Sequence, residues 1–478
     1  MPSIKKNFFY SSILTTANYL FPLLTFPYVS RVLGVTNVGI VNFVDSVIHY
    51  FILFSMMGIG VLGIREIAKC KHDQQQLNKT FSSLFWLNTL TTTAGLLLLF
   101  IVTYAIPQLY THFQMMMIGA VKLVMNYMLV EWFYKGLEEF KFITIRTLVI
   151  KVLYVISVFV FVHEPTDYAV YYGLSVMMVA GNALVNIIYS HHFAVLYLRN
   201  ISINLYLKPF VMLGVYSLLT SMYTSFNVVY LGMVCDETEV GYYSTASKLY
   251  KILIALFTAF TGVMLPRMSS ILAEGKMDEF KNLLHKSSNI LFSFSIPLIV
   301  FTVIFAPTII LIISGKGYEG AILPMRIMMP LMLIIGYEQI LIVQTLMPLR
   351  KDDAVLRNSV AGALVGILFN ILLVSSLGSV GSSIVWIVSE VVVLCCGQYF
   401  VYKYIQSSFP WHLFIITIFI NLPLVGFLLI ITYLCEPLYA FFIGGIVTIL
   451  YFFSVYAFTN FNKDVSGLIL FGKSFFRK

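Results

Sequence analysis

Charged side chains are scarce in this sequence of 478 residues: Asp, Glu, Lys and Arg together make up 11%, whereas hydrophobic residues make up 59%. Soluble domains carry about 25% charged residues. The chain therefore lacks the polar side chains that a water-exposed surface of this length requires. This composition excludes a soluble enzyme, a nucleic-acid-binding protein and a disordered scaffold, and a lipid bilayer is the solvent that suits it.

Cofactor motifs are also absent from the sequence. The five cysteines have no metal-ligand spacing, and no glycine-rich loop could hold a nucleotide phosphate. We therefore expect no metal, no other cofactor and no nucleotide hydrolysis by this chain. The cysteines are interpreted as small apolar residues, and a disulfide between Cys235 and Cys435, both near the predicted outer face, stays open as an alternative.

Long apolar runs dominate what is present. About fourteen stretches reach the roughly 20 residues that a membrane-spanning helix needs. Because the runs are long and unbroken, they predict helices and not a β-barrel. The expected fold is an all-α polytopic membrane protein with about 14 transmembrane helices, at residues 7–30, 38–64, 80–106, 112–134, 145–163, 168–196, 209–234, 240–266, 288–313, 321–347, 355–375, 380–402, 411–434 and 438–459.

The basic residues predict the orientation of these helices. Of the 30 Lys and Arg residues, 23 fall on one side, with Arg146 and Arg357 at the ends of predicted spans counted among them. Two (Arg31 and Lys316) fall in loops on the other side, and five lie deeper within the spans. Loops rich in Lys and Arg stay in the cytoplasm. Both termini are therefore expected to be cytoplasmic. The net charge of +9 then reflects topology and requires no nucleic-acid partner.

The sequence also indicates an internal repeat. At an offset of 202 residues, Val38-Gly39 matches Val240-Gly241, Gly60 matches Gly262, and Arg65 matches Arg267. These matches predict two six-helix lobes in a parallel pseudo-twofold repeat, at 1–200 and 201–404, with two further helices and a cytoplasmic tail at 405–478. Repeats of this kind are typical of transporters that hold a substrate between two lobes and work by alternating access.

Several segments resemble one transporter family. These are FPLLTFPYVSRVLGVTNVGIVNFVDSVIHYF, followed by GIGVLGIREIAK, then EWFYKGLEEFKFITIRTLVIKVL at 131–153 and MRIMMPLMLIIGYEQILIVQTLMPL at 325–349. They resemble polysaccharide repeat-unit flippases (Wzx-like O-antigen and capsule transporters). The resemblance implies the fold of the multidrug/oligosaccharidyl-lipid/polysaccharide exporter superfamily.

The same resemblance implies a substrate and a location. The substrate would be an undecaprenyl-diphosphate-linked oligosaccharide, moved from the inner to the outer leaflet of the bacterial cytoplasmic membrane for O-antigen, capsule or exopolysaccharide assembly. The other partners that we expect are membrane lipid, a coupling ion (H⁺ or Na⁺) and further polysaccharide-assembly proteins.

Ionisable side chains within the spans are the candidate site residues, because each costs about 2.5–3.5 kcal/mol to bury in a bilayer. Basic groups would bind the substrate's diphosphate and sugar. Arg is suited to bidentate phosphate contacts. The candidates are Arg326, Lys122, Lys248 and, at an outer helix end, Arg31. An internal salt bridge, or a side chain that reaches the membrane surface, would explain the same residues.

Acidic residues within the spans are the candidates for ion coupling. Asp45 and His49 lie four residues apart and so share one face of a helix. A carboxylate in apolar surroundings can exchange a proton near neutral pH. Glu131, Glu338 and Glu390 are further candidates, and a structural ion pair is the competing interpretation for each of them.

Two other classes of function stay open. A cation-coupled drug or metabolite antiporter of the same superfamily would share the fold, but the spans hold five basic and four acidic residues, which favours an anionic substrate. A polytopic glycosyltransferase or polymerase usually needs a large outer loop, and the predicted outer loops are short. We therefore expect a transporter and not an enzyme.

Overall fold

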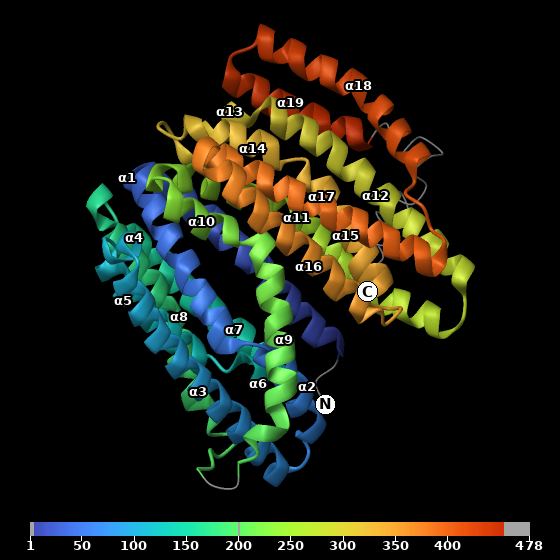
Figure 1. Ribbon diagram of the computed structural model, residues 1–478. Coiled ribbons are helices and arrows are strands. Elements are labelled where there is room, and N and C mark those ends of the chain that lie inside the picture. Colours follow the sequence, from blue (N-terminus) through green and yellow to red (C-terminus); the bar gives the residue numbers. More distant parts are fainter. Residues whose placement is uncertain (1–3, 199–200, 454–478) are drawn as a thin grey trace. The chain divides into compact units, whose positions relative to one another are not determined.

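The computed structural model describes residues 4–198 and 201–453, and every regular element in these ranges is a helix (Figure 1). The predicted all-α membrane fold is confirmed: eleven helices in the described ranges are long and apolar enough to span a bilayer. Many large apolar side chains on these helices are exposed, with Met177, Met212 and Tyr433 among the extreme cases. Such a surface requires a lipid environment.

The chain divides into two compact units, Met1–Gly241 and Tyr242–Lys478. This division follows spatial packing, whereas the boundaries at 200 and 404 follow a sequence repeat and stay a prediction. The N-terminal unit contains α1 (Ile4–Met56), α2 (Ile59–Cys70), α3 (Gln74–Ala105), α4 (Pro107–Tyr110), α5 (Phe113–Met128), α6 (Glu131–Gly136), α7 (Phe140–Phe161), η1 (Pro165–Asp167), α8 (Tyr168–Ser190), α9 (Ile203–Thr224) and α10 (Phe226–Val234).

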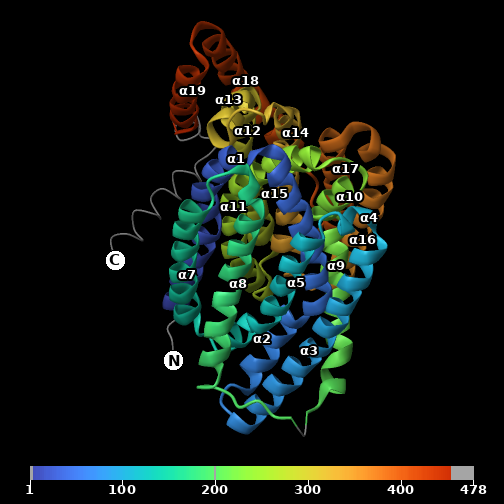
Figure 2. The same ribbon diagram turned by 90° about the vertical axis from the view of Figure 1, so that its left-hand side faces the viewer.

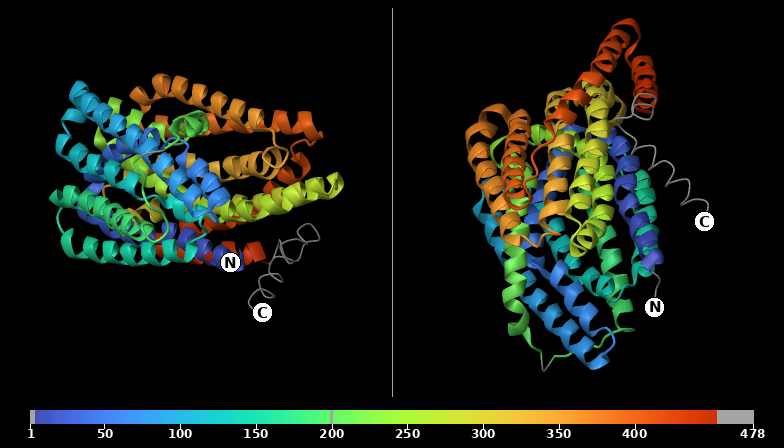
Figure 3. Two further views of the ribbon diagram at one scale, coloured as in Figure 1. Left: turned by 90° about the horizontal axis from the view of Figure 1, so that it is seen from below. Right: turned by 90° about the vertical axis from the view of Figure 1, so that its right-hand side faces the viewer.

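The C-terminal unit begins within α11 (Glu237–Ala273), whose first residues belong to the N-terminal unit. Helix α12 packs against α15, α18 and α19 (Figure 3). The unit contains α12 (Met277–Ile304), α13 (Ala306–Ser314), η2 (Glu319–Ala321), α14 (Ile322–Met328), α15 (Leu331–Leu341), η3 (Ile342–Leu346), α16 (Asp352–Phe369), η4 (Asn370–Val374), α17 (Ser375–Ile405), α18 (Trp411–Leu434) and α19 (Pro437–Tyr451).

Two glycines divide the longest helical runs. Gly34 in α1 has φ 75° and ψ 168°, and Gly378 in α17 has φ 55° and ψ −131°. A residue with a side chain can adopt either conformation only with backbone strain. Each glycine therefore ends one helix and starts the next without a loop. The expected number of about fourteen spans stays a prediction, because α19 has only 15 described residues.

The basic segments 65–79 and 267–286, which separate predicted spans and would form inner loops, are mostly helical in the structure. Three residues separate α2 from α3, and the Asp73 side chain caps α3 by accepting hydrogen bonds from the amides of Gln75 and Gln76. In the turn between α11 and α12, Lys276 Nζ lies 2.6 Å from Glu274 Oε2. A hydrogen bond from Lys276 lowers the pKa of Glu274.

Helices α2 and α3 pack side by side at the predicted inner end of the N-terminal unit (Figure 2), where an aromatic core stabilises them. Phe81 on α3 contacts Trp132 and Phe133 on α6, with ring centroids 5.9 and 4.5 Å apart. Helix α2 packs closely because Gly63 faces Trp132, and a Cβ at Gly63 would lie 2.4 Å from the indole. The core fixes α2, α3 and α6, and with them the polar residues on neighbouring helices.

Candidate functional site

Asp45 and Lys122 form an ion pair inside the N-terminal unit. Asp45 lies on α1 and Lys122 on α5, and the Lys122 ammonium donates a hydrogen bond to Asp45 Oδ1. The Lys122 side chain is 20% exposed and the Asp45 side chain 41%. An isolated charge at this depth is costly, and pairing reduces that cost. The structure thus brings together a predicted diphosphate-binding residue and a predicted coupling carboxylate.

Tyrosine side chains surround this pair. The Lys122 ammonium lies 5.9 Å from the centre of the Tyr172 ring on α8, within the range of a cation–π interaction. Helix α8 approaches α5 closely at Gly119, where a Cβ would lie 3.0 Å from the Tyr172 hydroxyl oxygen. That hydroxyl is buried and interacts with the Asp45 carboxylate. The site therefore offers a cation, a carboxylate and a tyrosine hydroxyl.

A second polar cluster joins α6, α7 and α8 of the same unit. The Arg146 side chain is 4% exposed, and its Nη2 lies 3.2 Å from Glu131 Oε1. Its Nη1 donates to Asn186 Oδ1, and Nη2 also donates to the Thr147 hydroxyl at 2.9 Å. Glu131 also forms an ion pair with Lys135, whose Nζ lies 3.3 Å from Glu131 Oε2. The predicted coupling residue Glu131 is therefore part of an ion-pair network that connects three helices.

The charge pattern groups Arg146 with the basic residues of the inner segments, at the cytoplasmic end of the predicted span 145–163, whereas the structure buries its side chain inside the N-terminal unit. Helix α7 begins at Phe140, so Arg146 lies almost two turns inside it. The only signal in the sequence is its spacing of 15 residues from Glu131, which points to no contact unless the turn between the helices is known.

Glu338 and Glu390 lie in the interior of the C-terminal unit, on α15 and α17. They are 9% and 2% exposed, and their carboxyl groups are close enough to interact. Trp386 Nε1 donates to Glu390 Oε1 at 3.0 Å, and the Tyr250 ring packs edge-on against Trp386. Glu338 Oε2 is buried with no hydrogen-bond partner in the described part of the chain.

These two glutamates differ from the other acidic candidates in their charge environment. Within the described ranges, neither forms an ion pair with Lys, Arg or His. Buried charges are normally paired. Two carboxyl groups in contact without a cationic partner cannot both carry a charge at low cost.

The remaining predicted site residues lie outside these three clusters of polar side chains. Arg326 on α14 is exposed and donates from Nε to the Val303 carbonyl at 3.2 Å. Arg31 bonds the Pro27 carbonyl at 2.9 Å, within its own helix. Lys248 lies on α11 and His49 on α1, one turn from Asp45. Whether Lys122 and Arg326 share a site stays a prediction.

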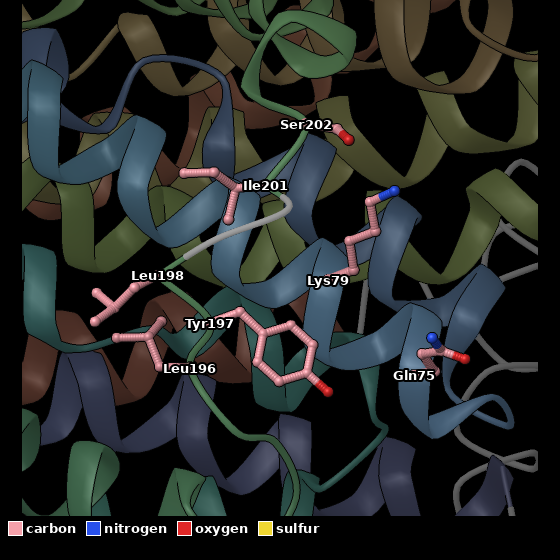
Figure 4. A pocket seen from close by; sticks show the side chains of 7 residues that line it. All are labelled: Gln75, Lys79, Leu196, Tyr197, Leu198, Ile201 and Ser202. Carbon is pink, nitrogen blue, oxygen red and sulfur yellow. The ribbon is translucent and has the colours of Figure 1, made fainter.

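A hollow of about 940 Å³ lies at the predicted inner end of the N-terminal unit (Figure 4). Lys79 and Gln75 of α3 face it from one side, and Tyr197 from the other. The segment before α9 is bonded to α3: the Trp86 indole donates to the Tyr197 carbonyl at 3.0 Å, and the Tyr197 amide donates to Ser82 Oγ at 2.8 Å. The hollow opens at the surface and is separate from the Asp45–Lys122 pair.

Comparison with known proteins identifies the family. Residues 4–272, more than half of the chain, match the family described as "Polysaccharide biosynthesis protein". The chain belongs to this family. The resemblance to polysaccharide repeat-unit flippases is thereby confirmed. Two relatives carry the name "Putative O-antigen transporter". The one from Escherichia coli (strain K12) is 24% identical over 82% of this chain and 95% of its own length, and the one from Shigella dysenteriae is 25% identical over 82% and 98%.

Solved structures confirm the superfamily fold. The inward closed conformation of the lipid II flippase MurJ superposes with a TM-score of 0.76, covers 92% of this chain and 96% of that one, and is 15% identical. An inward-facing multidrug MATE transporter of the MOP superfamily gives a TM-score of 0.60, with 82% and 96% coverage and 14% identity. The family member described here is therefore built on a transporter fold.

Proposed function

We propose that this chain moves an undecaprenyl-diphosphate-linked oligosaccharide from the inner to the outer leaflet of the bacterial cytoplasmic membrane, for O-antigen, capsule or exopolysaccharide assembly. Family membership, relatives named for O-antigen transport, and the likeness to a lipid flippase fold support this proposal. The chain acts as a transporter and not as an enzyme, works by alternating access, and has both termini in the cytoplasm.

The observation that carries the proposal is the Asp45–Lys122 pair beside Tyr172. A diphosphate and the Asp45 carboxylate are both anions, so they compete for the Lys122 ammonium. When the substrate binds Lys122, Asp45 loses its ion-pair partner. The Asp45 side chain is 41% exposed, so it can bind the coupling ion in place of Lys122, and substrate binding and ion binding are linked. Tyrosine hydroxyls and rings supply the hydrogen bonds and stacking that a sugar needs.

Deletion of the gene tests the overall function. In the host, deletion is expected to remove surface polysaccharide and to leave lipid-linked repeat units in the membrane fraction, and the wild-type gene restores export. Normal export without the gene contradicts the proposal.

Substitution of the basic residues tests the site. Lys122→Ala and Arg326→Ala are each expected to reduce surface polysaccharide at a normal protein level in the membrane, because each removes a cation available to the diphosphate. Arg326→Lys is expected to restore part of the activity. Lys281→Ala, which removes an exposed lysine on α12, is the control. Wild-type export by the Lys122→Ala, Arg326→Ala double variant would show that the diphosphate binds elsewhere.

Glu338 and Glu390 are proposed as the second site for the coupling ion. A carboxylate only accepts hydrogen bonds, so two buried carboxyl groups in contact need a proton or Na⁺ between them. In proteoliposomes, Glu338→Gln and Glu390→Gln are expected to abolish the response of transport to an imposed ion gradient, whereas Glu279→Gln on the exposed face of α12 retains it.

Parallel measurements with H⁺ and Na⁺ gradients identify the ion. Asp45→Asn is compared in the same assay. A response lost only in Asp45→Asn places coupling at Asp45 and His49 and contradicts a role for the glutamate pair.

A further inference from the structure

Two segments separated by 202 residues meet at the predicted outer end of the N-terminal unit. One is the start of the second half of α1, just after Gly34, and the other is the first turn of α11. Thr36 Oγ1 and Thr238 Oγ1 lie 3.0 Å apart and form a hydrogen bond. These two threonines are equivalent positions of the 202-residue repeat, so a residue of one copy contacts its own counterpart.

The neighbouring glycines repeat this relation in both directions. A Cβ placed on Gly39 would lie 1.7 Å from the Glu237 carbonyl oxygen, and a Cβ placed on Gly241 would lie 2.2 Å from the Val35 carbonyl oxygen. Val35 and Glu237 are themselves equivalent in the repeat. Each glycine thus lies against the backbone four positions before the other glycine, and neither position has room for a methyl group.

Further bonds hold the two segments at this crossing. Glu237 Oε1 lies 2.9 Å from His112 Nε2 at the start of α5, which fixes the first turn of α11 to the rest of the unit. On the other side, the Asn37 side chain donates to the Pro165 carbonyl at 2.8 Å. Residues 35–39 and 237–241 are therefore in direct backbone contact, with side-chain hydrogen bonds on both sides of the contact.

We infer that Gly39 and Gly241, with Thr36 and Thr238, form the outer gate of the transport path: they close it in this structure and must separate before substrate can leave outward. This inference rests on the proposed function. Where two backbones touch directly, no gap remains between them for water or sugar. Such a contact can also open without a large side chain having to leave the path. The four residues are positioning residues and bind no substrate.

The first test is cross-linking of the closed gate. In a chain whose five native cysteines are replaced by alanine, Thr36→Cys with Thr238→Cys is expected to form a disulfide under mild oxidation, because the two hydroxyl oxygens lie 3.0 Å apart. The cross-link is expected to stop transport, and a reductant restores it. The single-cysteine variants are the controls. Absence of the cross-link, or wild-type transport by the cross-linked chain, overturns the gate.

The second test uses glycine pairs that are matched by the repeat. Gly39→Ala and Gly241→Ala prevent close approach, whereas Gly60→Ala and Gly262→Ala add a methyl group where no atom lies within 4 Å. The probe is Ser46→Cys, two helical turns below Gly39 on the same face of α1, labelled by a membrane-impermeant maleimide added outside intact cells. Gly39→Ala is expected to increase the labelling rate about tenfold, and Gly60→Ala leaves it unchanged.

The labelling result does not depend on the substrate. Equal labelling in the two glycine variants overturns the gate even if export is normal, whereas a change in labelling without any effect of gene deletion on polysaccharide would contradict only the proposed function. If Gly39→Ala fails to reach the membrane, cross-linking of the threonine pair, which keeps both glycines, decides the question.

Discussion

Arg146 shows how a single buried cation can organise one unit of this chain. Its guanidinium bonds residues of α6, α7 and α8, and it is almost completely excluded from solvent. A buried ion pair stabilises little when it is compared with a well-packed apolar group, but removal of one partner leaves an uncompensated charge and unsatisfied hydrogen bonds. The Asp45–Lys122 pair is more exposed and can exchange partners, which suits transport.

Arg146→Ala is therefore expected to destabilise the protein by about 3 kcal/mol, measured as a fall in the thermal unfolding temperature in detergent. Asn186 Oδ1 would lose its hydrogen-bond donor, and Glu131 would keep Lys135 as its ion-pair partner. Lys141→Ala, which truncates an exposed residue at the start of the same helix, is the control. Equal unfolding temperatures for the two variants would show that the network contributes nothing to stability.

At the scale of the helix, glycine determines where the longest elements break. Pro22 and Pro27 lie inside α1 without ending it, whereas Gly34 does end the helix through its positive φ. A proline removes one backbone hydrogen bond but can keep helical backbone angles. The backbone angles of Gly34 are far from helical, so the regular helix stops there. The tight turn at Gly34 places Thr36 and Gly39 next to α11.

Gly34→Ala is expected to cost about 1–3 kcal/mol of stability from backbone strain alone, because no atom lies within 4 Å of the added methyl group. Gly173→Ala on α8 also has free space but a helical backbone, so it is expected to be neutral or to stabilise by about 0.5–1 kcal/mol. Thermal unfolding of both variants measures the difference. Similar values would mean that the chain relaxes at Gly34 without strain.

The existence and type of the helices could be predicted from apolar runs, because a bilayer imposes helical structure on any such run. Their ends could not be predicted as well. The helices α2, α3, α11 and α12 extend through segments that look like loops, since a cap such as Asp73 and a few buried residues such as Leu77 continue a helix through a charged sequence.

The sequence also does not predict which charged side chains pair with each other inside a unit. Asp45 and Lys122 were identified separately from their position in apolar runs, but they are 77 residues apart, and only the packing of α1 on α5 brings them together. The contact of Glu338 with Glu390 likewise depends on how α15 packs on α17. The sequence indicated which side chains need a partner but could not indicate which partner each one finds.

At the scale of the whole molecule, the orientation in the membrane is the property that the charges predict. A cysteine in place of Lys276, in the turn between α11 and α12, is expected to react only with reagents that enter the cell, because 23 of the 30 basic residues lie on that side. A cysteine in place of Lys316, between α13 and η2, is expected to react from outside. Labelling of the Lys276→Cys variant from outside in intact cells would reverse the predicted topology.

The contact between Thr36 and Thr238 has a consequence for the history of the chain. A residue that touches its own counterpart is what lies on the axis of a symmetric homodimer, so the geometry is that of an isologous interface now made within one polypeptide. A dimer must carry every substitution twice, whereas a fused chain can change one copy alone. Position 35 is valine and its counterpart 237 is glutamate, and only Glu237 meets a histidine. Fusion thus allows one glutamate–histidine contact on a single side of the axis, where a homodimer would be forced to make two.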